Sequence, residues 1–305
     1  MSRFFIFTVL IFSISSQLIA SETDKRVIAF AQDTMANDFR KAQVNEVRDE
    51  ILKHPEFKFV YSDGRGQTSL MIRQIEKFIK QKVDLLIVGT NNEKTIVPAV
   101  TKAYQSGIPV IILDRGILSD QYTTYIKYNN REIGQIAGRF IAEKLQGNGQ
   151  VLLFEGVPNT NVTNQRTIGF LDEINKYKNI RIVRRTGNFL RKDAIYEMEK
   201  LLKNNVRFDA VFSESDSMLS GVRLVLARYR IDPASIVMVG VDYISEARAA
   251  ILDGSQMATV TYPLGGKTSV EIAVKILNKE PVPRQVHMPF QLVTKYNVNN
   301  VSPIF

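Results

Sequence analysis

Residues 107–115 read GIPVIILDR, an apolar run that ends in two opposite charges. The run is too short for a typical helix, and its branched residues favour a strand that is buried on both faces. An acidic and a basic side chain follow at its carboxyl end, which is where open parallel sheets bind their ligands. The stretch therefore predicts a strand of a parallel sheet, with Asp114 and Arg115 at the ligand-binding edge.

Similar apolar runs occur along the rest of the chain and alternate with segments that have the spacing of amphipathic helices. We expect strands at 27–31, 57–61, 83–88, 108–113, 151–154, 180–183, 208–212 and 236–239. We expect helices at 39–52, 70–79, 96–104, 133–145, 162–174, 194–202 and 219–229. Two successive sets of strand–helix units predict an α/β protein made of two doubly wound parallel-sheet domains.

The first 20 residues differ in character from the rest of the chain. Arg3 precedes a run from Phe4 to Ile14 that is almost wholly apolar, and the small residue Ala20 precedes a polar tract. This is the layout of a secretory signal peptide. An uncleaved membrane anchor and a buried first strand are the alternatives, but the run has about 11 residues where a spanning helix needs about 20. We therefore predict a signal peptide at residues 1–20 and a mature chain in the periplasm.

The composition, with 45% hydrophobic and 23% charged residues, is that of a soluble globular protein. The net charge of +9 is spread along the chain, without the basic stripe and interleaved aromatic residues that indicate nucleic-acid binding. The chain has no cysteine, which excludes both disulfide bonds and a lipid anchor attached to a cysteine. We therefore expect a soluble protein that does not bind nucleic acid. We also expect it to be a monomer.

Polar side chains follow most of the expected strands and should collect at one rim of each sheet. The set suits a polyol, because a carboxylate accepts from two hydroxyls, Arg donates through a planar fork and an aromatic ring covers the apolar face of a sugar. Two interpretations without a ligand stay open: Asp216 as a helix N-cap, and Asp114 with Arg115 as a salt bridge at the rim. The segments are Gln32-Asp33-Thr34, Asp114-Arg115, Glu155-Gly156, Ser213-Glu214-Ser215-Asp216, Asp242 and Thr261-Tyr262.

Signals of catalysis are weak. His54 and His287 are the only histidines, and with no cysteine to join them they do not indicate a metal site. The chain has no Gly-x-Ser-x-Gly elbow and no complete phosphate loop. Glu214 and Asp216 are a carboxylate pair, but their place on one short segment does not set an acid and a base across a glycosidic bond. We therefore predict a binding protein without a cofactor rather than an enzyme.

The segments 37–43 (NDFRKAQ), 107–115, 166–170 (RTIGF) and 239–242 (VGVD) carry a family resemblance. At these residues the chain resembles the periplasmic sugar-binding proteins of the ribose and galactose type, whose fold is that of type I periplasmic binding proteins. The resemblance extends from about Lys25 to Thr294, and segment 107–115 is its most specific part. The pair Phe39-Arg40 is most similar to the galactofuranose-binding members, which have an aromatic residue followed by Arg there.

The resemblance implies roles for individual side chains. Phe39 would stack on a sugar ring, and Phe189 would supply an aromatic side chain on the opposite wall. Ser215 and Tyr262 depart from the ribose-type pattern, which has Asn and Gln at these positions, so the identity of the sugar stays open. Arg40, Asp114, Arg115, Arg166 and Asp242 would hydrogen-bond to hydroxyl groups, and Gln32 and Asp216 complete the expected ligand-binding set.

The resemblance also implies three crossings between two lobes, near Lys127-Tyr128, Pro263 and Met288-Pro289. The expected lobes are residues 24–127 with 264–288, and residues 128–263 with 289–305. A helix at 266–278 and the final strand would return to the first lobe. Such a hinge allows open and closed forms, and a ligand that binds the closed form better would favour closure.

Two partners are compatible with this reading. The leading expectation is that the protein delivers a monosaccharide to an inner-membrane ABC permease. The alternative is that it presents its ligand state to a membrane sensor histidine kinase. A sugar-responsive repressor shares the architecture but needs a DNA-binding head of about 50 residues before the first strand, and here only the signal segment precedes Val27.

Overall fold

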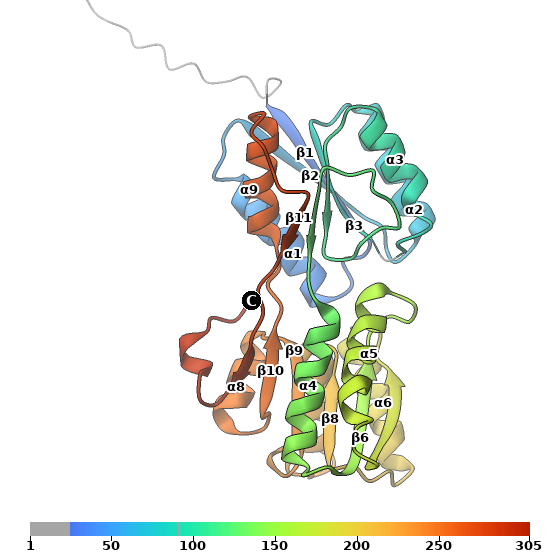
Figure 1. Ribbon diagram of the computed structural model, residues 1–305, viewed down its shortest axis with the longest axis vertical. Coiled ribbons are helices and arrows are strands. Elements are labelled where there is room, and N and C mark those ends of the chain that lie inside the picture. The colour runs from blue at the N-terminus through green and yellow to red at the C-terminus, as the bar shows by residue number, and fades with distance from the viewer. Residues whose placement is uncertain (1–24, 91) are drawn as a thin grey trace, which may run out of the picture.

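The computed structural model describes residues 25–90 and 92–305. The predicted signal peptide lies outside these residues. They form two lobes, one above the other in Figure 1, each built on a mainly parallel sheet with helices on both faces. No helix in this part of the chain is long and apolar enough to cross a lipid bilayer.

The first lobe contains a six-stranded parallel sheet in the order β2-β1-β3-β4-β5-β11. Helices α1 and α9 pack on one face of this sheet, and α2 and α3 pack on the other. The strands are β1 (Arg26–Gln32), β2 (Phe57–Asp63), β3 (Leu85–Gly89), β4 (Val110–Leu113), β5 (Thr124–Lys127) and β11 (Gln285–His287). The helices are α1 (Asp38–Ile51), α2 (Thr68–Lys80), α3 (Val97–Gln105) and α9 (Gly266–Leu277).

The second lobe contains a sheet in the order β7-β6-β8-β9-β10-β12, in which only β12 runs antiparallel to its neighbour. Helices α4 and α5 pack on one face, and α6 and α7 on the other. The strands are β6 (Asn148–Glu155), β7 (Asn179–Thr186), β8 (Ala210–Ser213), β9 (Val237–Asp242), β10 (Ala258–Thr261) and β12 (Leu292–Thr294). The helices are α4 (Asn130–Lys144), α5 (Asn161–Ile174), α6 (Arg191–Lys203), α7 (Asp216–Arg228) and α8 (Ser245–Asp253), with short 3-10 turns at Pro233–Ser235 and Val298–Asn300.

The predicted α/β fold of two doubly wound parallel sheets is confirmed. Every strand and helix expected from the alternating pattern is present, within a few residues of its expected ends. Three elements were not expected: β5, α8 and one of the two strands β11 and β12, since a single final strand was predicted. These strands have only three or four residues each, and α8 buries only two alanines and one isoleucine. Elements of this length carry too little periodicity to stand out in a sequence.

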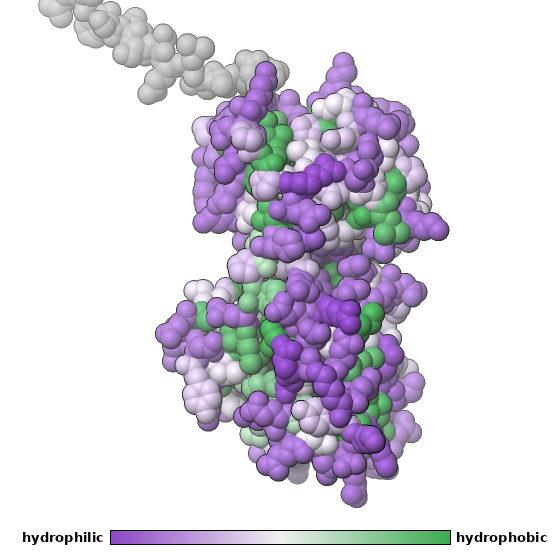
Figure 2. Space-filling view, viewed as in Figure 1, coloured by the Kyte–Doolittle hydropathy of each residue, from purple (hydrophilic) through white to green (hydrophobic). Residues whose placement is uncertain are grey.

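The chain crosses between the two sheets three times: after β5, after β10, and between β11 and β12. One expectation was wrong, because two strands rather than one follow α9. The first of them, β11, returns to the first sheet, and the final strand β12 joins the second. Figure 2 shows the molecule narrowing between the lobes, where these crossings lie. The exact lobe boundaries stay a prediction.

Candidate functional site

A cavity lies between the lobes, at the carboxyl ends of the strands of both sheets. Side chains reach it from the start of α1, from the residues after β4, β7 and β10, and from α5 and the end of β9. The space between atoms is about 380 Å³, including the part that opens to solvent. Nine of the eleven predicted site residues line it: Phe39, Arg40, Asp114, Arg115, Arg166, Phe189, Ser215, Asp242 and Tyr262.

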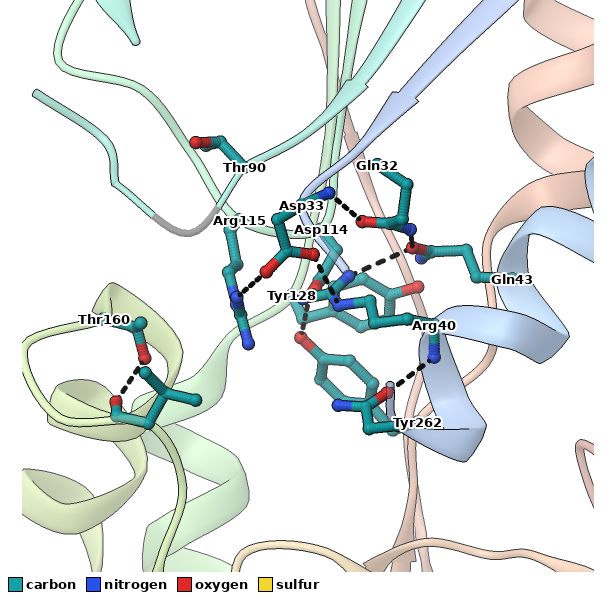
Figure 3. Close-up of polar contacts among 12 residues, drawn as sticks. Gln32, Asp33, Arg40, Gln43, Thr90, Asp114, Arg115, Tyr128, Thr160 and Tyr262 are labelled. Carbon is teal, nitrogen blue, oxygen red and sulfur yellow. Dashed lines mark hydrogen bonds and ion pairs between the residues drawn. The ribbon is translucent and has the colours of Figure 1, made fainter. Parts of the chain in front are cut away.

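Two buried ion pairs on the first lobe cross between chain segments (Figure 3). Arg40 Nη2 lies 2.6 Å from Asp114 Oδ2, and Arg115 Nη1 lies 2.8 Å from Asp33 Oδ2. Asp33 Oδ1 also lies 3.6 Å from Arg40 Nε. The alternative of a salt bridge between Asp114 and Arg115 is therefore wrong, because each of them binds a partner from another segment. Since all four side chains are nearly fully buried, loss of one partner would leave an uncompensated buried charge.

Charge and burial act differently on Asp114 and Asp242, two aspartates that line the cavity. Burial alone would raise the pKa of Asp114, but the guanidinium groups of Arg40 and Arg115 hold this pKa below its usual value. Burial raises the pKa of Asp242 well above its usual value, and Arg166 offsets only part of that effect. Hydrogen bonds donated by a ligand would stabilise the ionised form of Asp242.

Three of the cavity residues have a backbone conformation that residues with a Cβ seldom adopt. Asp114, Phe189 and Asp242 have φ values of 71°, 57° and 114°. Such conformations cost on the order of 1–3 kcal/mol each, and they occur mostly where a binding site must be held in one geometry. Each of the three follows or ends a strand, so the chain turns there in a way that keeps the side chain at the cavity.

Arg166, on α5, is held by contacts within the second lobe. Its Nε donates to Asn130 Oδ1 at 2.9 Å, and its Nη1 donates to the backbone oxygen of Glu214 at 2.6 Å. The guanidinium lies over the ring of Tyr262, 4.4 Å from its centroid. These contacts fix the group and leave Nη2 without a partner among the described residues, so it is placed to donate to a ligand.

Aromatic rings lie on both walls of the cavity. The ring centroids of Phe39 and Tyr262 are 5.6 Å apart. Phe189 lies on the second lobe, with the Arg115 guanidinium 5.7 Å from its ring centroid. The Phe189 ring packs directly on Gly156, where a Cβ atom would come within 1.9 Å of the ring. The arrangement offers apolar faces to the C–H side of a sugar ring.

Gln32 and Asp216 are the two predicted residues that do not line the cavity. Gln32 Nε2 donates to Gln43 Oε1 at 3.0 Å, and the same oxygen accepts from Arg40 Nη1 at 3.0 Å. Gln32 therefore helps to orient Arg40 through their shared acceptor, the side-chain oxygen of Gln43. Gln32 does not line the cavity, and its side-chain amide lies beside that of Gln43 (Figure 3).

Asp216 is fully buried beneath the cavity wall. Its carboxylate accepts hydrogen bonds from Tyr243 N at 2.7 Å, Gln256 Nε2 at 2.9 Å and Thr259 Oγ1 at 2.7 Å. The N-cap interpretation of Asp216 was wrong by one residue, because Ser215 caps α7. Asp216 instead ties together the loops after β8 and β9 and the strand β10.

The structure adds cavity residues that were not predicted: Asn37, Asp38, Val162 and Ser217. Asp38 connects the two lobes, because Ser217 Oγ lies 3.3 Å and Arg191 Nη2 lies 3.7 Å from its Oδ2. Asn37 and Asp38 lie inside the segment 37–43 that carries the family resemblance. Their place in this segment is the sequence feature that could have identified them as cavity residues. No sequence pattern indicated the contacts of Asp38 with the other lobe.

Glu214, behind Arg166, is a buried carboxyl group whose Oε2 accepts from the backbone N–H of Gly156 at 2.9 Å. Thr167 Oγ1 lies 2.8 Å from Glu214 Oε1 and 2.8 Å from Glu155 Oε1. A hydroxyl group has one proton to donate, so one of the two carboxyl groups must donate to it. Two hydrogen bonds from Arg184 also reach Glu155. Burial raises the pKa of Glu214 to about 8, so Glu214 carries a proton at neutral pH and can be the donor.

We expect Glu214→Gln to stabilise the protein increasingly as the pH rises. A buried acid whose pKa is raised from 4.5 to about 8 stabilises the fold below pH 4.5, and this stabilisation is lost as the pH rises towards 8. The amide mimics the protonated acid at every pH. Urea unfolding at pH 5, 7 and 9 measures the difference between variant and wild type, which should grow by several kcal/mol. Glu76→Gln, at the surface, is the matched control, and a constant Glu214 difference would contradict the assignment.

Comparison with known proteins agrees with this geometry. A family model described as a periplasmic binding protein domain matches residues 28–281. The ribose import binding protein RbsB of Bacillus subtilis is 28% identical over 270 residues, covering 88% of this chain and 87% of that protein. The galactofuranose-binding protein YtfQ of Escherichia coli is 25% identical over 242 residues, covering 76% of each.

A solved structure extends the comparison to three dimensions. The fructose-binding periplasmic domain of a hybrid two-component system has a TM-score of 0.82 and 29% identity, covering 90% of this chain and 92% of that one. The family model matches residues 28–281, and these residues include most of both lobes and the residues that line the cavity between them. The chain belongs to the periplasmic binding protein domain family.

Proposed function

We propose that this protein is a periplasmic solute-binding subunit that captures a monosaccharide in the cavity between its lobes and delivers it to an inner-membrane ABC permease. The observation that carries the proposal is the convergence of carboxylates, guanidinium groups and aromatic rings from both lobes on one buried cavity. Hydroxyl groups of a sugar both donate and accept, and such a set satisfies them in either role. Binding to ribose and galactofuranose among the relatives supports the same ligand class.

The buried charges favour a neutral ligand. Arg40 and Arg115 form buried ion pairs with Asp114 and Asp33, and the third guanidinium group, of Arg166, shares the cavity with the carboxyl group of Asp242. An additional charge on the ligand would upset this balance in a site where burial makes an unpaired charge costly. A neutral polyhydroxylated compound adds hydrogen bonds without adding charge.

Calorimetry and thermal-shift measurements test the proposal. The panel is D-ribose, L-arabinose, D-galactose, D-fructose and myo-inositol, with D-glucuronate as the charged comparator. We expect at least one neutral monosaccharide to bind with a micromolar or lower Kd and to stabilise the protein by about 2.7 kcal/mol at a hundredfold excess over Kd. Mass spectrometry should recover the sugar unchanged, as for a binding protein.

Two variants assign the binding to this cavity. Arg166→Ala should abolish the measured binding, because it removes a buried donor and releases Tyr262 and the Glu214 carbonyl. Arg139→Ala, an exposed residue on the neighbouring helix, should bind as the wild type does. If no neutral sugar binds, or if a bound sugar is converted, the proposed function is wrong.

A second candidate output is signalling to a membrane histidine kinase. It is favoured by the 0.82 TM-score and 29% identity to a sugar-binding domain of a two-component system. The two outputs differ in the protein that recognises the closed form. Ligand-dependent stimulation of a permease ATPase in proteoliposomes supports delivery, whereas ligand-dependent binding to a kinase ectodomain, with none to the permease, supports signalling.

A further inference from the structure

Tyr262 is fixed on both faces of its ring. It follows β10 at the crossing back to the first lobe, and its side chain is almost fully buried. One face stacks on Tyr128, with centroids 3.9 Å apart and planes at 21°. The Arg166 guanidinium covers the ring at 4.4 Å, and the hydroxyl of Tyr128 is itself bonded to the Pro263 carbonyl. A ring packed in this way cannot swing aside without loss of these contacts.

The hydroxyl group of Tyr262 forms a hydrogen bond with the carboxylate of Asp114. Tyr262 Oη donates to Asp114 Oδ1 at 2.5 Å and accepts from Asn130 Nδ2 at 3.4 Å. The other oxygen, Asp114 Oδ2, binds Arg40 Nη2 at 2.6 Å. Both oxygens of Asp114 are therefore engaged by side chains of the protein itself, and the Tyr262 ring stands beside the first of them (Figure 3).

Two other residues that line the cavity, Asp242 and Arg115, are less completely hydrogen-bonded than Asp114. No side chain of the described residues donates to the carboxyl group of Asp242, which lies close to the backbone N–H of Asp216. The Nε of Arg115 is buried without a partner. Asp242 and Arg115 are 4% and 5% exposed, so the hydrogen bonds that they lack can come only from a molecule in the cavity or from water. Asp33 Oδ1, 3.6 Å from Arg40 Nε, is also buried without a hydrogen-bond partner. The unfilled hydrogen-bonding capacity of the site therefore belongs to Asp33, Arg115 and Asp242, and not to Asp114.

We propose that Tyr262 determines specificity by closing the Asp114 end of the cavity, so that the ligand is a pentose-sized polyol that presents its hydroxyl groups to Asp242 and Arg115 and has no hydroxymethyl group at the Asp114 end. This inference rests on the proposed function and narrows its ligand class. The site would select a pentose because it excludes the larger hexose. A hexose must either displace the Tyr262 ring or find no space for its hydroxymethyl group.

Matched sugars test the proposal. D-Ribose and D-allose, D-xylose and D-glucose, and L-arabinose and D-galactose each differ by one hydroxymethyl group. For the wild type we expect the pentose of the best-binding pair to have a Kd at least tenfold lower than its hexose. Tyr262→Gln removes the ring and should reduce this Kd ratio by tenfold or more. Tyr262→Phe keeps the ring and should leave the ratio within about threefold, while binding of both sugars weakens because Asp114 loses a donor.

Tyr243→Phe is the matched control. Tyr243 is a fully buried tyrosine of the second lobe whose hydroxyl donates to backbone oxygens near the C-terminus, and it does not line the cavity. The ratio of hexose Kd to pentose Kd in the Tyr243→Phe variant should equal that of the wild type. Thermal unfolding of each variant shows whether it is folded, and the wild-type ratio tests the proposal even if Tyr262→Gln does not fold.

The outcomes separate this inference from the proposed function. Failure of the wild type to bind any sugar overturns both. Sugar binding with a wild-type preference for the hexose, an unchanged ratio in Tyr262→Gln, or an equal loss of preference in Tyr262→Phe overturns only the role of the Tyr262 ring. A ratio reduced in Tyr262→Gln and kept in Tyr262→Phe supports it.

Discussion

Asp114→Ala is expected to destabilise the protein by about 3–5 kcal/mol, the usual cost of removing one partner from a buried ion pair. Asp114 is 3% exposed and accepts from Arg40 at 2.6 Å and from Tyr262 at 2.5 Å. Without it, Arg40 keeps only the more distant Asp33 as a buried counter-charge. Ligand affinity should fall at least tenfold as well, because Arg40 and Tyr262 both line the cavity and both lose the group that orients them.

Urea unfolding and calorimetry measure these two effects. Asp49→Ala is the control, because Asp49 is a 60%-exposed partner of Arg48 on the surface of α1, and such pairs contribute about 0–1 kcal/mol. Equal losses of stability in the two variants would contradict the account of Asp114 as part of a buried network.

Gly169→Ala is expected to cost at least about 3 kcal/mol of stability, at the upper end of overpacking penalties. Helices α4 and α5 approach each other at this residue, where a Cβ atom would lie 1.9 Å from the carbonyl oxygen of Arg131. Backbone atoms cannot give way as a side chain can, so the helices must separate. Arg166 lies one turn earlier on α5, and its displacement should reduce ligand affinity in parallel.

The same two measurements apply, with Gly254→Ala as the control. Gly254 ends α8 at a φ of 85°, and no atom lies within 4 Å of its Cβ position. The control therefore reports the strain of the left-handed backbone, about 1 kcal/mol, without a steric clash. If Gly169→Ala is no more destabilising than Gly254→Ala, the close approach of α4 and α5 is not a constraint on the fold.

Much of the site was predictable because a rule of topology relates it to the sequence. Parallel strands end at one edge of a sheet, so Asp114, Arg115 and Asp242 could be placed near a ligand from their positions after apolar runs. The same rule could not separate Asp242, which lines the cavity, from Asp216, which is buried behind it. Both follow strands, and only the packing of Tyr243 and Thr259 around Asp216 distinguishes them.

The ion-pair partners of Asp114 and Arg115 also could not be predicted from sequence position. Asp114 and Arg115 are adjacent in sequence, yet each binds a residue more than 70 positions away. Adjacent residues at the end of a strand point in different directions, so the partner of each depends on where α1 and the end of β1 come to lie.

The amino-acid sequence by itself determined the two doubly wound sheets, because continuous apolar runs and helical periodicity are local properties that each segment carries alone. It also determined the residue types available at the sheet edges. Only the tertiary structure decided how those residues divide between the cavity and its support, and that Tyr262 binds Asp114 across 148 residues. Such contacts depend on the relative placement of two lobes, which no local pattern encodes.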